Sequence, residues 1–182
     1  VQYNTSITYG SFTDDRDDKT YKTVLIGNQI WMAQNLEYLG ETKSEKAMDC
    51  HIYGQMYSWE EAKEVSPPGW HLATLDEWVE MINYLEGDSI AGGNLKEAGT
   101  EHWHSPNKGA TNSCGFTALP AGGWDANSGG FRRGETTYFW TDSEQEDGSL
   151  TIIILNHNSS GIVQQKEWPI DKAFSVRLIK DD

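Results

Sequence analysis

Residues 68–78, Pro-Gly-Trp-His-Leu-Ala-Thr-Leu-Asp-Glu-Trp, have the pattern of a turn that leads into an amphipathic helix. The proline and the glycine end the preceding element, because proline fixes φ and lacks an amide donor while glycine permits a sharp bend. Thr74 is a favourable N-cap, and Glu77 three residues later completes the pattern of a capping box. Apolar residues then recur at helical spacing as far as Leu85, and Gly87 marks the end. The pattern predicts a helix of about ten residues that buries one apolar face.

The flanking sequence predicts strands on both sides of this helix. Residues 21–36 have the pattern of a β-hairpin that turns at Gly27-Asn28. Residues 150–155 are a nearly continuous apolar run, as expected for a strand buried on both faces. Alternation over residues 173–179 predicts a last strand that closes the sheet beside the N-terminal strands. The other assignments are a helix over 56–62, strands over 116–120, 136–141 and 162–165, and irregular loops over 87–114 and 121–134.

The length of the chain and the order of these elements indicate the fold class. Two helices followed by a glycine-rich β region are typical of an α+β fold rather than of alternating βαβ units. A chain of 182 residues is long enough to bury one sizeable core. We therefore expect a single α+β domain over residues 1–182.

The charge of the chain restricts its partners. Its 14 Lys and Arg residues oppose 28 Asp and Glu residues, which gives a formal net charge of −14. Such a charge repels phosphates and anionic membranes, so we expect no nucleic-acid partner. A run of roughly 20 apolar residues is missing, so we expect no membrane insertion. Neutral glycans, cations and basic proteins are compatible with the charge, and so is a merely solvated acidic surface.

Residues 14–19, Asp-Asp-Arg-Asp-Asp-Lys, bring several carboxylates close together. Calcium prefers oxygen ligands, which makes this ion a candidate cofactor. The sequence lacks the glycine and the distal glutamate of an EF-hand loop, however. A plain turn between strands, with no cofactor, is the favoured interpretation.

The chain contains two cysteines, Cys50 and Cys114. They are too few for a disulfide scaffold, and they lack the spacing of metal ligands. They form either one long-range disulfide or two unrelated buried thiols.

The Trp-His-Leu turn and the motifs around it resemble the Fibrobacter succinogenes major paralogous domain. The matching motifs lie in residues 13–21, 26–36, 53–59, 70–78, 94–96, 115–120, 138–140 and 174–177. That family is similar in fold to C-type lectin-like domains and to formylglycine-generating enzymes. The resemblance implies a C-type lectin-like fold, with two helices packed on a twisted, mostly antiparallel sheet and with long irregular loops. The family usually carries glycine where Asp18 stands, which implies a tight turn there.

The resemblance does not extend to catalysis. Formylglycine-generating enzymes use a pair of reactive cysteines near the C-terminal part of the fold, and the C-terminal third of this chain has no cysteine. A Cys114 nucleophile with His102 or His104 as its base lacks an evident group to orient the base. His102 and His104 could also hold zinc, but further ligands are not evident and a solvated pair is the plainer interpretation. We therefore expect neither enzymatic activity nor a resident metal.

A ligand site is expected instead among aromatic residues in the polar loops. Indole rings can stack on the flat C–H faces of sugars, while Asp, Asn and Arg pair with sugar hydroxyls. Trp103, Trp124 and Trp168 lie in irregular polar segments, and Trp124 stands beside Asp125 and shortly before Arg132. Alternatively, these tryptophans only anchor the loops to the domain. The Glu-Pro-Asn and Trp-Asn-Asp triplets of calcium-dependent lectins are missing from the sequence, so we expect no calcium-bridged sugar site.

These features predict a non-catalytic carbohydrate-binding module, secreted or at the cell surface. Members of the resembling family often occur in organisms that attach to plant cell walls, which implies a plant cell-wall polysaccharide as the ligand. The alternative is a protein-binding or structural module of a cell-surface assembly, because loops on a rigid scaffold commonly carry recognition.

Overall fold

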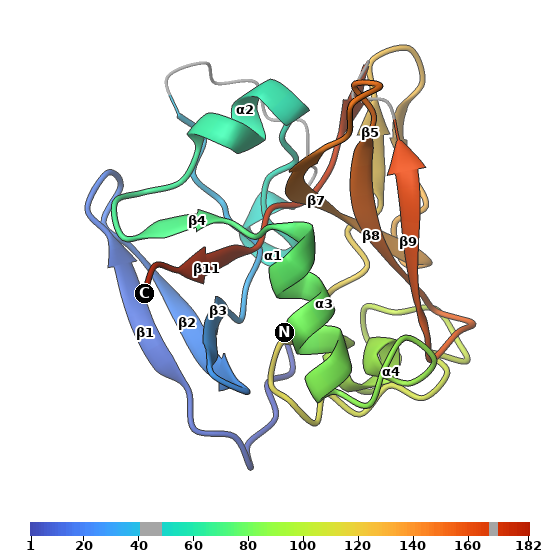
Figure 1. The fold of residues 1–182 in the computed structure, drawn as a ribbon. Helices are drawn as coiled ribbons and strands as arrows, with labels where there is room; N and C mark the ends of the chain where they lie inside the picture. Colours follow the sequence, from blue (N-terminus) through green and yellow to red (C-terminus); the bar gives the residue numbers. More distant parts are fainter. Residues whose placement is uncertain (41–48, 168–170) are drawn as a thin grey trace.

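The computed structural model describes residues 1–40, 49–167 and 171–182, which form a mixed α+β structure built mostly from strands (Figure 1). The strands pair antiparallel in three sheets. They are β1 Gly10–Asp14, β2 Lys19–Ile26, β3 Gln29–Met32, β4 Trp70–Leu72, β5 Gly123–Asp125, β6 Gly129–Phe131, β7 Thr136–Glu144, β8 Leu150–Asn156, β9 Ile162–Glu167, β10 Lys172–Ala173 and β11 Leu178–Lys180. The helices of the described residues are α1 Cys50–Tyr53, α2 Trp59–Glu64, α3 Leu75–Tyr84 and α4 Ala91–Leu95. Within this part of the chain, each helix is too short or too polar to cross a membrane.

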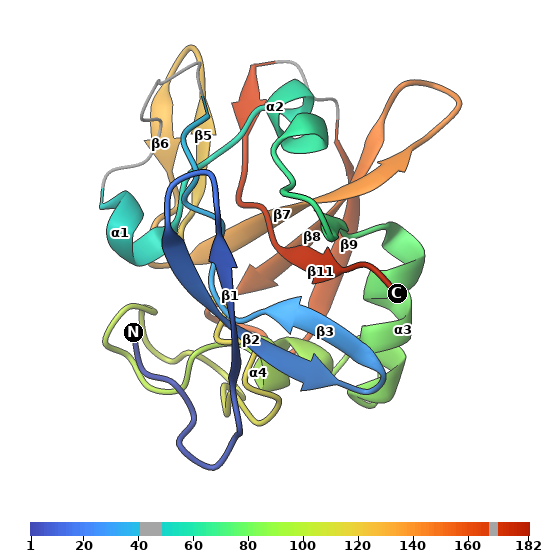
Figure 2. The same ribbon diagram turned by 90° about the vertical axis from the view of Figure 1, so that its left-hand side faces the viewer.

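The largest sheet has the strand order β1-β2-β3-β11-β4 (Figure 2). β2 and β3 form the predicted hairpin, in which Val24 pairs with Trp31 and the turn residue Gly27 has a φ of 63°. β11 lies between β3 and β4, with Ile179 paired to Trp31 on one side and to His71 on the other. The predicted last strand does lie beside the N-terminal strands, but it covers residues 178–180 rather than 173–179, and Ala173 belongs to β10 in another sheet.

Helix α3 begins where the sequence predicts. The hydroxyl of its N-cap Thr74 accepts from the Glu77 amide at 3.3 Å, and Glu77 Oε2 accepts from the Thr74 amide at 2.8 Å. After the last helical residue, the Gly87 amide donates to the Ile82 carbonyl at 2.9 Å, and Gly87 has a φ of 89°. The capping box and the glycine therefore fix both ends of this helix.

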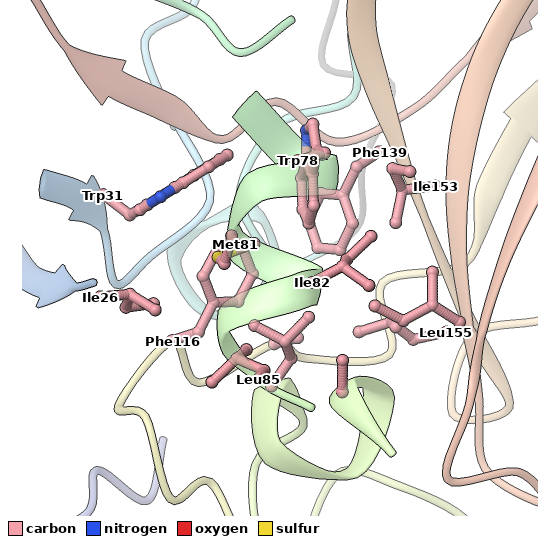
Figure 3. Packing of buried hydrophobic residues seen from close by; sticks show 14 of the residues in the cluster. Ile26, Trp31, Trp78, Met81, Ile82, Leu85, Phe116, Phe139, Ile153 and Leu155 are labelled. Carbon is pink, nitrogen blue, oxygen red and sulfur yellow. The ribbon is translucent and has the colours of Figure 1, made fainter. Parts of the chain in front are cut away.

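The buried face of α3 lies between the largest sheet and the β7-β8-β9 sheet (Figure 3). The centroid of the Trp78 ring lies 5.0 Å from that of Trp31 on β3 and 5.5 Å from that of Phe139 on β7. Ile153 and Leu155 of β8 are fully buried in the same cluster. One continuous apolar core thus joins α3 to both sheets, and the strands predicted over 136–141, 150–155 and 162–165 are confirmed.

Two sequence assignments in the second half of the chain are wrong. Residues 121–134, predicted as a loop, contain the β5-β6 hairpin, to which β10 adds a third strand. Its polar, glycine-rich composition is typical of a loop, but here glycine is required for packing. A Cβ on Gly123 would lie 2.5 Å from the Phe131 ring and 2.9 Å from that of Phe174. Residues 116–120, predicted as a strand, make only an isolated bridge between Lys96 and Ala118.

The helices differ from prediction in number and in bounds. α2 begins at Trp59 rather than Met56, because Tyr57 is held extended by hydrogen bonds of 2.9 and 3.0 Å with the Phe174 backbone. α4 lies in a segment predicted as a loop, and α1 lies in a segment for which the sequence predicted no element. In α4, a Cβ on Gly92 would lie 2.3 Å from the Gly161 carbonyl oxygen, so close packing against another loop requires glycine there.

Candidate ligand-binding site

A pocket of about 420 Å³ lies beside α2, and we call it the α2 pocket. Three separate segments line it: the turn after β1, the stretch after β3, and the stretch from the end of α1 through α2. Its lining includes Arg16, Tyr38, Gln55, Tyr57, Glu60, Glu61 and Glu64. Pockets of this size are typical of small-ligand sites.

Arg16 reaches this pocket from the acidic turn. Its guanidinium donates to both carboxylate oxygens of Asp14, at 2.8 and 2.6 Å, and to the Val65 carbonyl at 2.8 Å. Although burial alone would raise the pKa of Asp14, the hydrogen bonds from Arg16 hold that pKa below its usual value. Asp18 has a φ of 58°, so the predicted tight turn is confirmed. The buried carboxylate of the turn is therefore bound by arginine.

Tyr38 is held in place from two sides. The guanidinium carbon of Arg16 lies 3.8 Å from the centroid of its ring, which is a cation–π contact. The buried Tyr57 hydroxyl donates to the Tyr38 carbonyl at 2.7 Å. The aromatic wall of the pocket is thus fixed by its neighbours rather than by a ligand.

Helix α2 contributes carboxylates to the lining. Ser58 caps the helix, and Glu61 Oε2 accepts from the Ser58 amide at 2.7 Å and from its hydroxyl at 2.8 Å. Glu60 pairs with Lys63 at 2.8 Å, and its side chain is 80% exposed. Glu64 is exposed at the last position of the helix. The pocket therefore offers acceptors whose backbone is fixed by a capped helix.

Gln55 adds a donor to the same lining. The residue is only 2% exposed, and its amide nitrogen has no hydrogen-bond acceptor in the part of the chain that the structure describes. A buried polar group without a partner destabilises a fold by about 1–3 kcal/mol, so such groups are rare and commonly coincide with function.

Comparison with known proteins identifies the family to which the chain is similar. The family model described as the Fibrobacter succinogenes major domain matches residues 24–180, well over half of the chain. The chain belongs to this family. No curated protein and no solved structure gave a significant match. All the pocket residues named above except Arg16 lie within the Fibrobacter succinogenes major domain, and Arg16 precedes the matched region.

The predicted residues Trp124, Asp125 and Arg132 of this family member lie on the β5-β6 hairpin or directly after it. Asp125 accepts from the amides of Asn127 and Ser128, at 2.9 and 3.1 Å, and from Lys172 Nζ at 2.6 Å. The hydrogen bonds from Lys172 and Asn127 lower the pKa of Asp125 to about 2. The hairpin turn therefore occupies this carboxylate.

The other two hairpin residues differ in exposure. Trp124 is half-buried and packs against the apolar cluster that contains Met56. Arg132 is exposed, with a φ of 56°. The structure thus brings Trp124 and Asp125 onto one strand and leaves Arg132 facing solvent.

The interpretation of Trp103 as a ligand contact is wrong. This residue is 1% exposed, belongs to the core beside α3, and donates from its indole nitrogen to the Ala118 carbonyl at 2.9 Å. The ring anchors the loop to the core, which is the alternative that the sequence left open. Trp168 lies outside the described residues.

Of the two possibilities left open for the cysteines, the disulfide is not formed, because Cys50 and Cys114 are free thiols. Cys50 packs against the small apolar cluster around Tyr53, whereas Cys114 packs against the core beside α3. Burial raises the pKa of Cys114 to about 11, so its thiol is inert at neutral pH. The two residues are the unrelated thiols of the alternative interpretation.

His102 and His104 do not act together. His102 Nδ1 lies 2.7 Å from Glu97 Oε2, while the His104 ring lies 6.3 Å from that of His157, centroid to centroid. Buried Trp103 between them turns the two imidazoles to different surroundings. Over residues 1–40, 49–167 and 171–182, groups of three or more His, Cys, Asp or Glu side chains arranged to hold a metal are not found.

Sequence reasoning missed the α2 pocket, although two local signals pointed to it. Ser58 and Glu61 have the spacing of a second capping box, which would have placed the start of α2 and the direction of its carboxylates. Arg16 is flanked on both sides by pairs of carboxylates in the first turn, a pattern that predicts an internal ion pair. Contact between these segments and Gln55 has no local signature.

Proposed function

We propose that this member of the family is a non-catalytic carbohydrate-binding module and that the α2 pocket is its main binding site. The observation that carries the proposal is the combination of one fixed aromatic ring, an unpartnered buried amide and several carboxylates around a single pocket. A sugar ring has flat C–H faces that pack on aromatic rings, and its hydroxyls both donate and accept hydrogen bonds. Tyr38 offers a ring on which a sugar can pack, Gln55 can donate to a sugar oxygen, and Glu64 can accept from a sugar hydroxyl.

We further propose a plant cell-wall polysaccharide as the ligand and a secreted or cell-surface location. The family resemblance supports both, and the net charge of −14 is compatible with an uncharged polymer. The arrangement of α2 and α3 against antiparallel sheets supports a variant of the C-type lectin-like fold. In this proposal Trp124 and Arg132 on the hairpin supply accessory contacts to a long polymer.

The test is retention of the protein on insoluble cellulose, xylan, mannan and pectin, with and without a chelator. Tyr38→Ala removes the aromatic wall of the pocket, and we expect it to abolish retention on the polymer that binds the wild type. Tyr84→Ala is the matched control, because Tyr84 is 64% exposed on α3 and does not line the pocket. Trp124→Ala measures the accessory contribution of the hairpin. Equal retention of the Tyr38→Ala and Tyr84→Ala variants would refute the assignment of the pocket.

The alternative function is a protein-binding or structural module of a surface assembly. It is favoured by an exposed apolar pair near the tip of the β2-β3 hairpin, where Leu25 and Tyr84 are each 64% exposed. The Tyr84 ring lies against Gly27, since a Cβ there would be 3.4 Å from it. Failure of the wild type to bind any polysaccharide would favour this alternative.

A further inference from the structure

We propose that the α2 pocket selects saccharides that carry free amino groups, such as β-1,4-linked glucosamine. The inference rests on the carbohydrate-binding function proposed above and differs from it in the ligand, because cellulose, xylan, mannan and pectin carry no free amino groups. It follows from the charges around the pocket and from the direction of hydrogen bonding that its lining requires.

The only cation that lines the pocket in the described part of the chain is already paired. Arg16 binds both oxygens of buried Asp14, and the hydrogen bond between the two side chains raises the pKa of Arg16. The pair is close to neutral as a whole. Arg16 can stiffen the Tyr38 wall, but its charge is not available to attract an anionic ligand.

The carboxylates of α2 give the pocket its net charge. Glu64 has no ion-pair partner among the described residues, and Glu60 is paired only with Lys63 on the outer surface of the helix. One oxygen of Glu61 is fixed by the capping box. A ligand ammonium group near this helix would gain charge-assisted hydrogen bonds, whereas a uronic acid would be repelled.

Gln55 supplies the second, independent requirement. Gln55 lines the pocket, and its buried amide nitrogen can only donate, so it matches a sugar oxygen rather than an ammonium group. A ligand that satisfies both walls must therefore carry oxygen acceptors and a cationic donor. A sugar with free amino groups carries both.

The experiment compares three β-1,4-linked tetrasaccharides by isothermal titration calorimetry at low ionic strength: those of glucosamine, N-acetylglucosamine and glucose. We expect the glucosamine tetramer to bind best, and to lose its advantage when salt is raised, because exposed charges are screened. Glu64→Gln should lower the affinity for the glucosamine tetramer by about fivefold, because it removes one nearby charge at a solvent-exposed site. Glu86→Gln, at an exposed position just after the end of α3 and outside the pocket lining, is the matched control with the same change in net charge, and it should leave affinity unchanged.

Each other outcome contradicts a different part of the argument. If the three tetramers bind with equal affinity and Tyr38→Ala abolishes the binding of all three, the proposed selectivity for amino groups is wrong. The proposed carbohydrate-binding function would still hold. Equal weakening by Glu64→Gln and Glu86→Gln would show that overall charge, not the pocket, attracts the ligand. A tetralysine peptide that binds as well as the glucosamine tetramer would overturn the saccharide part. Failure of every tetramer to bind would overturn both proposals.

Discussion

The guanidinium carbon of Arg177 lies 4.2 Å from the centroid of the Phe116 ring, inside the protein and shielded from water. The same guanidinium donates to the carbonyls of Met32, Phe116 and Thr117 at 2.6–3.1 Å, and to the Asn35 side chain at 2.6 Å. Arg177 therefore connects the end of β3, the loop before β5 and the C-terminal segment, without a carboxylate partner among the residues that the structure describes. Burial lowers its pKa to about 9, which still leaves the group charged at neutral pH.

We expect Arg177→Met to lower the free energy of unfolding by about 3–5 kcal/mol, because it leaves several buried carbonyls without a donor. Urea unfolding followed by tryptophan fluorescence measures the change. Arg132→Met is the control, since Arg132 is exposed and substitutions at such positions change stability by less than about 0.5 kcal/mol. Similar unfolding midpoints for the two variants would contradict this role.

The glycines of α4 provide a second prediction. A Cβ on Gly93 would lie 2.3 Å from the Gly109 carbonyl oxygen, so Gly93→Ala should destabilise the protein by about 1–3 kcal/mol through overpacking. Gly130→Ala adds the same methyl group where the nearest atom is 3.9 Å away, and we expect almost no change. Thermal unfolding of both variants provides the comparison, and a tolerated Gly93→Ala would show that the α4 loop has room to move.

The two capping boxes allow stability and binding to be separated. Ser58→Ala and Thr74→Ala each remove an N-cap hydroxyl, and each should cost about 1 kcal/mol of unfolding free energy. Only Ser58→Ala also removes a hydrogen bond to Glu61 at the α2 pocket, although the amide of residue 58 still donates to that carboxylate, so only this variant should weaken saccharide binding. Calorimetry on folded samples tests the difference, and equal affinities would show that Glu61 does not contact the ligand.

His71 predicts a pH dependence of stability. Its Nδ1 lies 2.6 Å from Asp181 and its Nε2 lies 2.8 Å from Glu77. Burial alone would lower the pKa of His71, but the hydrogen bonds to Asp181 and Glu77 raise it above its usual value. The protonated form is thus favoured in the folded state, and its stabilising effect is present below about pH 6.5 and lost as the pH rises through the raised pKa.

The measurement is the urea midpoint at pH 5.5 and at pH 8.5. We expect the drop in midpoint between these values to be smaller in His71→Gln than in the wild type. His51→Gln is the control, because His51 is exposed on α1. An unchanged drop in His71→Gln would assign the pH dependence to other groups.

Local patterns in the sequence predicted the parts of the fold that short segments determine. The capping box at Thr74, the Gly27 turn and the apolar run over 150–155 each specify one element by themselves, and each is confirmed. The β5-β6 hairpin and α4 were missed because their glycines are required by close contacts with residues far away in the sequence. Gly92 faces Gly161 and Gly123 faces Phe174, relationships that no local window contains.

The candidate site was harder to predict for the same reason. Trp103 and Trp124 have similar polar sequence neighbours, yet one is 1% exposed in the core and the other is half-buried at a hairpin. Arg16, Tyr38 and Gln55 meet at one pocket only after the turn, the sheet and α2 have assembled. Residue types can be listed from sequence, but which of them meet is decided by tertiary packing.

The position of β11 between β3 and β4 has a consequence for biosynthesis. During translation, β3 and β4 leave the ribosome long before residues 178–180, and until then the hydrogen-bonding edges that β11 will occupy are unpaired. Open strand edges of this kind pair readily with other chains. The largest sheet can therefore be completed only after its final strand has been made, and a nascent chain that stalls before residue 178 would be a substrate for chaperones rather than a partly working domain.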